Sequence, residues 1–250
     1  LQEYLSTKPV AKKLESLFEQ APAGGERTIE ISQINSVAFR HVCFGYEDAS
    51  PILKDFSLKV NAGEKCIITG QSGSGKSTSM NLLLGYYEPQ SGEILINDSN
   101  AFCVKQLNEK IAIMRQDPVL FNDTLRNNLT MYRDMCDDEL IALLQKLNLH
   151  KFATPEGLDS MIREGGSNLS GGERKRIALA RTLLRKAPIT IVDEPLANVD
   201  SETAEKIEDI LTELSGGIVF VITHHFSDDK KKAFAKEFRF RHSHVEHGGI

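Results

Sequence analysis

The sequence predicts an α/β fold with a mainly parallel sheet, an N-terminal antiparallel β subdomain and an inserted helical subdomain. The first observation is that short apolar runs alternate with segments of helical periodicity, an order typical of βαβ units. Strands that are apolar throughout are buried on both faces, as they are in a parallel sheet. The expected strands are 65–69, 189–192 and 218–222, and the expected helices are 76–84, 173–186 and 204–214.

Two further observations define the smaller parts. The stretches TIEIS, SVAFRHVCF and FSLKV within 28–60, and GEILIN at 92–97, are short and separated by turn residues, which predicts antiparallel strands. Residues 117–172 are mostly helical in pattern, and segment 137–147 begins with acidic residues and carries leucines at helical spacing. Because this block lies between strands of the core, we expect it to form the inserted helical subdomain.

Residues 1–27 are expected to be separate from the domain that occupies 28–250. Apolar residues at four-residue steps predict an amphipathic helix over 8–20. The stretch APAGG at 21–25 then ends the helix and reads as a linker.

The composition is that of an ordinary globular protein. The chain has 250 residues and a net charge of −5, with a pI near 5.9. This acidic balance gives no electrostatic footprint for nucleic acid, so no nucleic-acid partner is expected. The four cysteines have no C-x-x-C spacing, which favours reduced, packed thiols. No apolar run approaches the roughly 18 residues that span a bilayer.

The segment GQSGSGKST at 70–78 has the G-x-x-x-x-G-K-S pattern of a phosphate-binding P-loop. Its glycines let backbone N–H groups wrap a phosphate chain, above a helix N-terminus that adds partial positive charge. The alternative is a chance Gly/Ser turn, and a P-loop alone does not distinguish a kinase, a GTPase or a motor. The predicted nucleotide-binding residues are Ser72, Gly73, Ser74, Gly75, Lys76, Ser77 and Thr78.

Two other predicted strands end in residues that suit the same chemistry. The strand at 189–192 runs into Asp193 and Glu194, and the strand at 218–222 is soon followed by His224. Ligands bind at the carboxyl ends of the strands in open α/β sheets, so these side chains should converge with the P-loop. Asp193 would hold Mg²⁺, Glu194 would polarise the attacking water and His224 would contact the γ-phosphate. The alternatives are a helix-start acid for Glu194 and a core or loop histidine for His224.

A second small polar loop opens onto the predicted helix at 173–186. Such a helix N-terminus is another anion-binding position, about 90 residues from the P-loop. One nucleotide cannot readily use both loops within a compact monomer, and a simple Ser/Gly N-cap is the alternative. The residues of this loop are Leu169, Ser170, Gly171, Gly172 and Glu173.

From Ser36 to His224 the sequence resembles the nucleotide-binding domain of ATP-binding cassette (ABC) transporters. GQSGSGKST resembles the family's Walker A motif, ITIVDE its Walker B motif and LSGGE its signature motif. In that family the signature motif completes the ATP site of a second domain across a head-to-tail dimer. The resemblance therefore implies an ATPase that uses ATP and Mg²⁺, with a second nucleotide-binding domain as its partner in a homodimer or heterodimer.

The same resemblance assigns four single residues. Gln116 matches the Q-loop, which senses Mg²⁺ and the attacking water, so it joins Ser77 and Asp193 as an expected Mg²⁺ contact. Tyr46 matches the aromatic residue that stacks on adenine, although a strand-end core tyrosine is the alternative. Asp200 matches the D-loop, and His224 matches the switch histidine.

Two stretches resemble the exporter branch of the family. They are DPVLFNDTLR at 117–126, and PEGLD at 155–159 with EGG at 164–166. The second resembles the region that contacts the membrane domain. The resemblance implies a transmembrane domain fused N-terminally, with the helix at 8–20 as the tether, and a place at the cytoplasmic face of the cell membrane. Export of a substrate is then the expected function.

The sequence also departs from the family pattern. Glu173 stands where Gln is common, His225 replaces a basic residue, and the match fades beyond Phe226. A soluble ABC ATPase that acts on DNA or ribosomes is one rival, but the long insertions, second cassette or basic face of that class are not visible. A non-hydrolysing regulatory half of a heterodimer is another, but such halves typically lack the carboxylate or the histidine, and both Glu194 and His224 are present.

Overall fold

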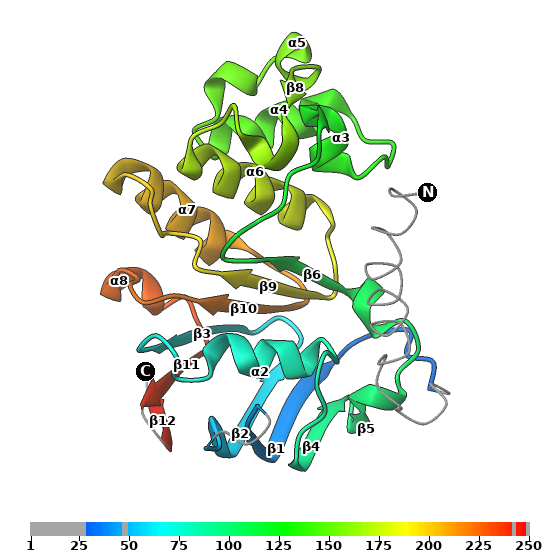
Figure 1. The fold of residues 1–250 in the computed structure, drawn as a ribbon, viewed down its shortest axis with the longest axis vertical. Helices are drawn as coiled ribbons and strands as arrows, with labels where there is room; N and C mark the ends of the chain where they lie inside the picture. The colour runs from blue at the N-terminus through cyan, green and yellow to red at the C-terminus, as the bar shows by residue number, and fades with distance from the viewer. Residues whose placement is uncertain (1–28, 47–49, 242–243, 249–250) are drawn as a thin grey trace, which may run out of the picture.

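A computed structural model of the chain describes residues 29–46, 50–241 and 244–248. The predicted N-terminal helix and linker lie outside these residues. The described part is built on two sheets, with a helical block at the far end of the molecule from the smaller sheet (Figure 1).

The larger sheet has six strands in the order β12-β11-β3-β10-β9-β6, and all neighbours are parallel except β11 and β12. The predicted parallel sheet is therefore confirmed. Because these strands run the same way, β3, β9 and β10 bring their carboxyl ends to one edge. The strands are β3 (Lys65–Gly70), β6 (Ile111–Met114), β9 (Ile189–Asp193), β10 (Ile218–Ile222), β11 (Lys236–Arg241) and β12 (His244–Gly248).

The smaller sheet is antiparallel, in the order β2-β1-β4-β5. Its strands are β1 (Ser36–Phe44), β2 (Leu53–Asn61), β4 (Ser91–Ile96) and β5 (Ser99–Asn100). The strand predicted at TIEIS is wrong, because the described part of that stretch makes only an isolated bridge between Ile29 and Val104. Nearby, the Asn97 side chain accepts hydrogen bonds from the N–H groups of Asn35 and Ser36, and so ends the ladder at β1.

Two apolar cores lie on opposite faces of the parallel sheet. Side chains alternate between the faces with a period of two, so Ile68 joins one core and Ile67 the other. The first core lies between the two sheets and includes α2 (Lys76–Leu83). The second is covered by α6 (Gly171–Leu184) and α7 (Ser201–Glu213) (Figure 1). The short helix α8 (Asp228–Lys231) follows β10.

The helical block packs on the second core through buried leucines, among them Leu140 and Leu144 of α4. Its main elements are α3 (Leu125–Thr130), α4 (Asp137–Lys146) and α5 (Pro155–Leu158), with a two-stranded ribbon of β7 (Asp123–Thr124) and β8 (Met161–Ile162). Short 3₁₀ turns occupy Ala101–Cys103, Leu107–Lys110, His150–Phe152 and Glu164–Gly166. Within the ranges that the structure describes, every helix is too short or too polar to cross a bilayer.

Candidate active site

One pocket of about 260 Å³ lies at the carboxyl edge of β3, β9 and β10. The structure brings to it most of the residues that the sequence singled out, from positions up to 178 residues apart (46 to 224). It also adds Ile52, whose side chain gives no motif signal in the sequence. The lining residues are Tyr46, Ile52, Ser72, Gly73, Ser74, Gly75, Lys76, Ser77, Thr78, Gln116, Asp193, Glu194 and His224.

The P-loop leads into α2, whose N-terminus has no side-chain cap. Gly75 is the N-cap of α2, in a left-handed conformation with φ of 104°, and no side chain bonds the first N–H groups of the helix. Lys76 folds back so that its ammonium donates to the carbonyls of Gly70 and Gln71, each at 2.8 Å. Burial lowers the pKa of Lys76, although Glu194 and Asp193 oppose the shift. The loop thus presents free N–H donors and a cation to an anionic ligand.

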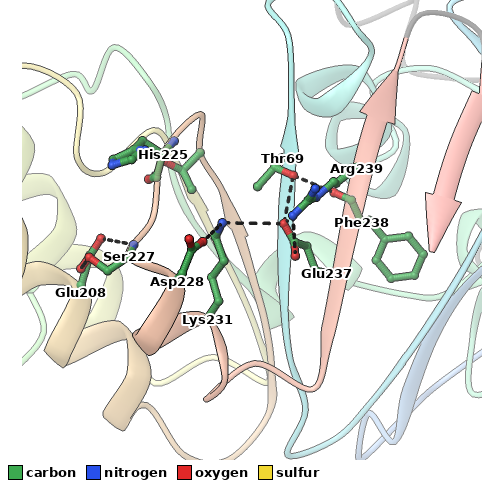
Figure 2. Close-up of polar contacts among 10 residues, drawn as sticks. Thr69, Glu208, His225, Ser227, Asp228, Lys231, Glu237, Phe238 and Arg239 are labelled. Carbon is green, nitrogen blue, oxygen red and sulfur yellow. Dashed lines mark hydrogen bonds and ion pairs between the residues drawn. The ribbon is translucent and has the colours of Figure 1, made fainter. Parts of the chain in front are cut away.

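β11 holds the start of this loop. A Cβ atom at Gly70 would lie 2.5 Å from the carbonyl oxygen of Phe240, so only glycine fits beside this strand. A larger cavity, of about 600 Å³, is lined by Gly70 and also by His224. In its lining, buried Glu237 accepts a hydrogen bond from Arg239 at 3.0 Å (Figure 2). The sequence did not indicate this charged lining, since β11 lies beyond the stretch with family motifs.

Asp193 and Ser77 form the part of the pocket that could hold a metal ion. The Ser77 hydroxyl donates to Asp193 Oδ2 at 3.1 Å, whereas Asp193 Oδ1 is buried and has no hydrogen-bond partner. Burial raises the pKa of Asp193, and the bond from Ser77 opposes that rise. An unpaired buried carboxylate oxygen beside a hydroxyl fits Mg²⁺, which prefers oxygen ligands. No cluster of three or more His, Cys, Asp or Glu able to bind a metal occurs among the described residues.

Glu194 and His224 face each other across the mouth of the pocket. Their side chains approach to 3.2 Å, between His224 Nε2 and Glu194 Oε1. The Glu194 side chain is only 9% exposed, whereas that of His224 is 50% exposed. Glu194 has a left-handed φ of 51°, and its N–H donates to Ile222 at 2.8 Å. Such strain in a non-glycine residue is typical of functional sites and here aims the carboxylate into the pocket.

The structure also shows a support for Glu194 that the sequence did not suggest. The Lys175 ammonium on α6 is buried and donates to the Glu194 carbonyl at 3.4 Å. This contact joins α6, the helix that follows the loop at 169–173, to the end of β9.

The aromatic end of the pocket is formed by Tyr46. Its ring packs edge-on against Phe44 and Tyr87, at 5.1 Å from each, and its hydroxyl lies 3.3 Å from Thr78 Oγ1. Tyr46 is therefore partly packed in the core and partly a wall of the site. Gln116 lies in the segment that follows β6. It also lines the pocket, and its side chain is exposed.

The loop at 169–173 lies apart from this pocket and contributes no lining residue to it. Ser170 and Glu173 form a capping box on α6: Ser170 Oγ accepts from the Glu173 N–H at 3.2 Å, and Glu173 Oε2 accepts from the Ser170 N–H at 2.8 Å. Glu173 also pairs with Lys151 at 2.6 Å. Partial burial alone would raise the pKa of Glu173, but Lys151 and Ser170 outweigh it and lower the pKa.

Asp200 begins the helix that follows Glu194. Its carboxylate caps α7 by accepting from the Thr203 N–H at 2.9 Å. The segment before it passes the signature loop, where the Asn198 carbonyl lies 3.5 Å from the position of a Cβ atom at Gly172. Asn198, two residues before Asp200, therefore lies beside Gly172, and neither residue lines the P-loop pocket.

Residues 53–197, more than half of the chain, match a family model described as ABC transporter. The chain belongs to the ABC transporter family. The match includes the P-loop, the signature loop and the strand that ends in Asp193, so it covers much of the geometry described above.

Relatives of this ABC transporter chain include an ATP-dependent flippase and an ATP-binding/permease protein. An ATP-dependent lipid A-core flippase of Syntrophus aciditrophicus is 36% identical over 226 residues, which cover 87% of this chain and 37% of the relative. The glutathione/L-cysteine transport system ATP-binding/permease protein CydD of Bacillus subtilis is 36% identical over 208 residues, 81% of this chain and 36% of the relative. The chain thus spans little more than a third of the length of these curated relatives.

A solved structure of a bacterial Atm1-family ABC exporter with ATP bound superimposes on this chain with a TM-score of 0.78 at 30% identity. The match covers 98% of this chain and 45% of the exporter chain. Within the ABC transporter family, this chain is therefore a nucleotide-binding domain of the exporter type.

Proposed function

We propose that this chain binds and hydrolyses ATP with Mg²⁺ and thereby powers export of a substrate through an attached transmembrane domain. The observation that carries the proposal is the 3.2 Å contact between Glu194 and His224 above an uncapped helix N-terminus. A P-loop used only for binding does not need a buried carboxylate and a histidine at this position. The pair supplies the groups that hydrolysis of a γ-phosphate requires.

Binding of the nucleotide is assigned to the lining of the pocket. Tyr46 would stack on adenine, since its ring forms the aromatic wall, and Lys76 would exchange its two carbonyl partners for phosphate oxygens. Charge-assisted hydrogen bonds of this kind are stronger than neutral ones. The remaining phosphate donors are the backbone and hydroxyl groups of Ser72, Gly73, Ser74, Gly75, Ser77 and Thr78.

Ser77, Asp193 and Gln116 would hold Mg²⁺, whose chemistry is to neutralise charge on the phosphate oxygens. Glu194 would orient a water for in-line attack and accept its proton, and a positioned base of this kind contributes ~10²–10⁴-fold in rate. His224 would donate a hydrogen bond to the γ-phosphate. The contact between the two side chains would hold both beside the γ-phosphate, on the side from which water attacks and opposite the bond to the leaving ADP.

A second nucleotide-binding domain is part of the proposal. The signature loop, Leu169 to Glu173, contributes no residue to its own P-loop pocket, which supports the proposal that its N–H groups act on the ATP of a partner. Two domains arranged head to tail would then enclose two nucleotides, with Asp200 close to the shared surface. Either two copies of this chain or two homologous domains satisfy the geometry.

The transmembrane partner is proposed from the relatives. Those relatives are named as a flippase and as an ATP-binding/permease protein, and each is more than twice as long as the matched region. We place the transmembrane domain before residue 1 and the ATPase domain at the cytoplasmic face of the membrane. Exposed apolar side chains on the helical block, including Val119, Phe121 and Met161, are consistent with such a contact.

Replacing the proposed base tests the mechanism. Glu194→Gln keeps the shape of the side chain and removes its charge, so phosphate release should fall by roughly 10²–10⁴-fold. ATP binding should persist, and a dimer that requires ATP should accumulate in size-exclusion chromatography. Measurements at several protein concentrations allow for weak dimerisation.

The matched control is Glu202→Gln on α7. Glu202 is an exposed carboxylate that pairs with Lys206 and lies away from the pocket, so turnover should be unchanged. If Glu194→Gln hydrolyses ATP at the wild-type rate, the proposed mechanism is wrong.

A further inference from the structure

His224 is carried by a short loop between β10 and α8, and its position depends on the backbone of that loop. Its ring is half exposed, so it is not held by close packing. The first half of the loop is fixed by Thr223, whose hydroxyl donates to the His225 carbonyl at 2.7 Å and accepts from the His225 N–H at 3.3 Å. The second half is fixed from a different element.

That element is α7, through Glu208. Glu208 is a buried carboxylate, 4% exposed, and both of its oxygens are used by one residue (Figure 2). Oε1 accepts from the Ser227 N–H at 2.9 Å, and Oε2 accepts from the Ser227 hydroxyl at 2.6 Å. Ser227 is the N-cap of α8, so the pair closes the exit of the loop. Phe226, between the histidines and Ser227, is buried as well.

The helix that carries Glu208, α7, is held in place by buried side chains and by an N-terminal cap. Ile207 and Leu211 on α7 are buried in the second core, at 1% and 0% exposure. Its first turn is capped by Asp200, in the segment that follows Glu194. The helix α7 therefore begins shortly after Glu194, the proposed base. Two turns later, its Glu208 holds the loop that carries His224, the proposed γ-phosphate contact.

We propose that Glu208 is a positioning residue for His224: its two hydrogen bonds to Ser227 set the backbone of the loop so that the imidazole meets Glu194 and the γ-phosphate. The inference rests on the proposed function, because it assigns Glu208 a role only if His224 acts on ATP. Catalytic groups lose efficiency steeply when they shift by about 1 Å, at a cost of up to ~10²-fold. A group that fixes the loop therefore affects turnover more than binding.

A purely structural role would also explain a buried carboxylate, since Lys230 on α8 lies 3.7 Å from Glu208. The neighbouring residue Asp209 separates the two explanations. It pairs with the same Lys230 at 2.6 Å, so it joins α7 to α8 without contact to Ser227. Asp209→Ala removes a bond between the helices and leaves the loop contacts intact.

The experiment measures kcat for ATP, the Kd for ADP and the thermal unfolding of each variant of the 250-residue chain. ADP lacks the γ-phosphate, so its binding does not use His224. Glu208→Ala should lower kcat by roughly tenfold, within the range expected for a displaced catalytic group, with little change in the Kd for ADP. Glu208→Gln keeps acceptor and donor atoms for Ser227 and should recover kcat to within about twofold of wild type, as should Asp209→Ala.

A double-mutant cycle with His224→Ala provides the decisive comparison. If Glu208 acts through His224, Glu208→Ala should cost nothing further once the imidazole is absent. Additive losses in the cycle, or equal losses in Asp209→Ala and Glu208→Ala, overturn the inference. If Glu208→Ala does not fold, Ser227→Ala removes only the 2.6 Å contact and should lower kcat about threefold, again only when His224 is present. Wild-type kcat in Ser227→Ala would then overturn it.

The outcomes also distinguish this inference from the proposed function. If the wild-type chain has no turnover, the proposed function and the role of Glu208 both fail. If His224→Ala is as active as wild type, the chain still hydrolyses ATP, and only the roles of His224 and Glu208 fail. If His224→Ala is inactive while Glu208→Ala matches wild type, only the role of Glu208 fails.

Discussion

Two helix N-termini in this domain are built from similar residues and are finished in opposite ways. α2 follows Gly73-Ser74-Gly75 and has no side-chain cap and no acidic residue in its first turn. α6 starts at Ser170-Gly171-Gly172-Glu173, where a capping box uses the N–H groups of Ser170 and Glu173. The first helix leaves its N–H groups for a ligand, and the second satisfies part of its own.

The difference separates two kinds of anion site. At α2 the free N–H groups, the helix dipole and Lys76 all act on one pocket, so this end can hold a whole phosphate chain. At α6 the carboxylate of Glu173 offsets the dipole, and in the proposed dimer Gly171 and Gly172 would act on the partner's nucleotide. A strong site and a weak, complementary site suit an interface that closes only when ATP is present.

The largest effect is expected from weakening the α2 site. Lys76→Ala removes a buried ammonium that would make charge-assisted bonds worth roughly 1.5–3 kcal/mol each, so affinity for ADP should fall by at least about tenfold. Isothermal titration of ADP measures this. Lys54→Ala, an exposed lysine on β2, is the control and should bind ADP normally. Unchanged affinity for ADP in Lys76→Ala would contradict the proposal that the N-terminus of α2 is the strong phosphate site.

A smaller and different effect is expected at the α6 site. Ser170→Ala should lower ATP turnover by about tenfold, because the proposed contact of its hydroxyl with the partner's phosphates would be lost, while ADP affinity of the single domain stays unchanged. The lost cap should also cost about 1 kcal/mol of stability. Thr154→Ala loses a comparable cap on α5, where Oγ1 accepts from the Gly157 N–H at 3.0 Å, so it controls for stability alone. Equal turnover in the two variants would contradict a role for Ser170 in the partner site.

The smallest effect is expected from Glu173→Gln, which leaves α6, like α2, without an acidic residue in its first turn. Without the carboxylate the helix dipole is less offset, so half-maximal turnover should need about two- to fivefold less ATP. A steady-state ATP titration measures the shift. A higher ATP requirement would show that the carboxylate assists the partner site.

The same variant predicts a pH dependence of stability. The pKa of Glu173 is lowered in the folded state, so the ionised group stabilises the fold above its unfolded pKa, and this contribution is lost as pH falls through the folded pKa. Glu173→Gln should therefore unfold about 1–3 °C earlier at pH 7, the shift expected for an exposed ion pair worth roughly 0.2–1 kcal/mol. The difference should shrink as the pH falls below the ordinary pKa of a glutamate, about 4.3, and vanish once Glu173 is protonated in the folded state. A difference that is constant with pH would exclude the ion pair with Lys151 as its cause.

The sequence determined the local structure where one pattern acts alone. The apolar run before the P-loop, the P-loop itself and the helix after it occur as predicted, because strand burial and the glycine pattern are local properties. The strand at 218–222 has the predicted bounds for the same reason. The stretch TIEIS has the composition of a strand, but its described part pairs with the rest of the chain only through the isolated bridge between Ile29 and Val104.

Only the tertiary structure decided which side chains meet. Asp193 and Ser77 are 116 residues apart, and their contact exists because β9 and β3 end at the same edge of the sheet. The fit of β11 against Gly70 and the bonds from Glu208 to Ser227 left no signal in the sequence, since both depend on pairing between distant elements. The order of residues along the chain predicts which side chains follow the carboxyl end of each strand. The packing of strands and helices sets the ångström distances on which the proposed hydrolysis depends.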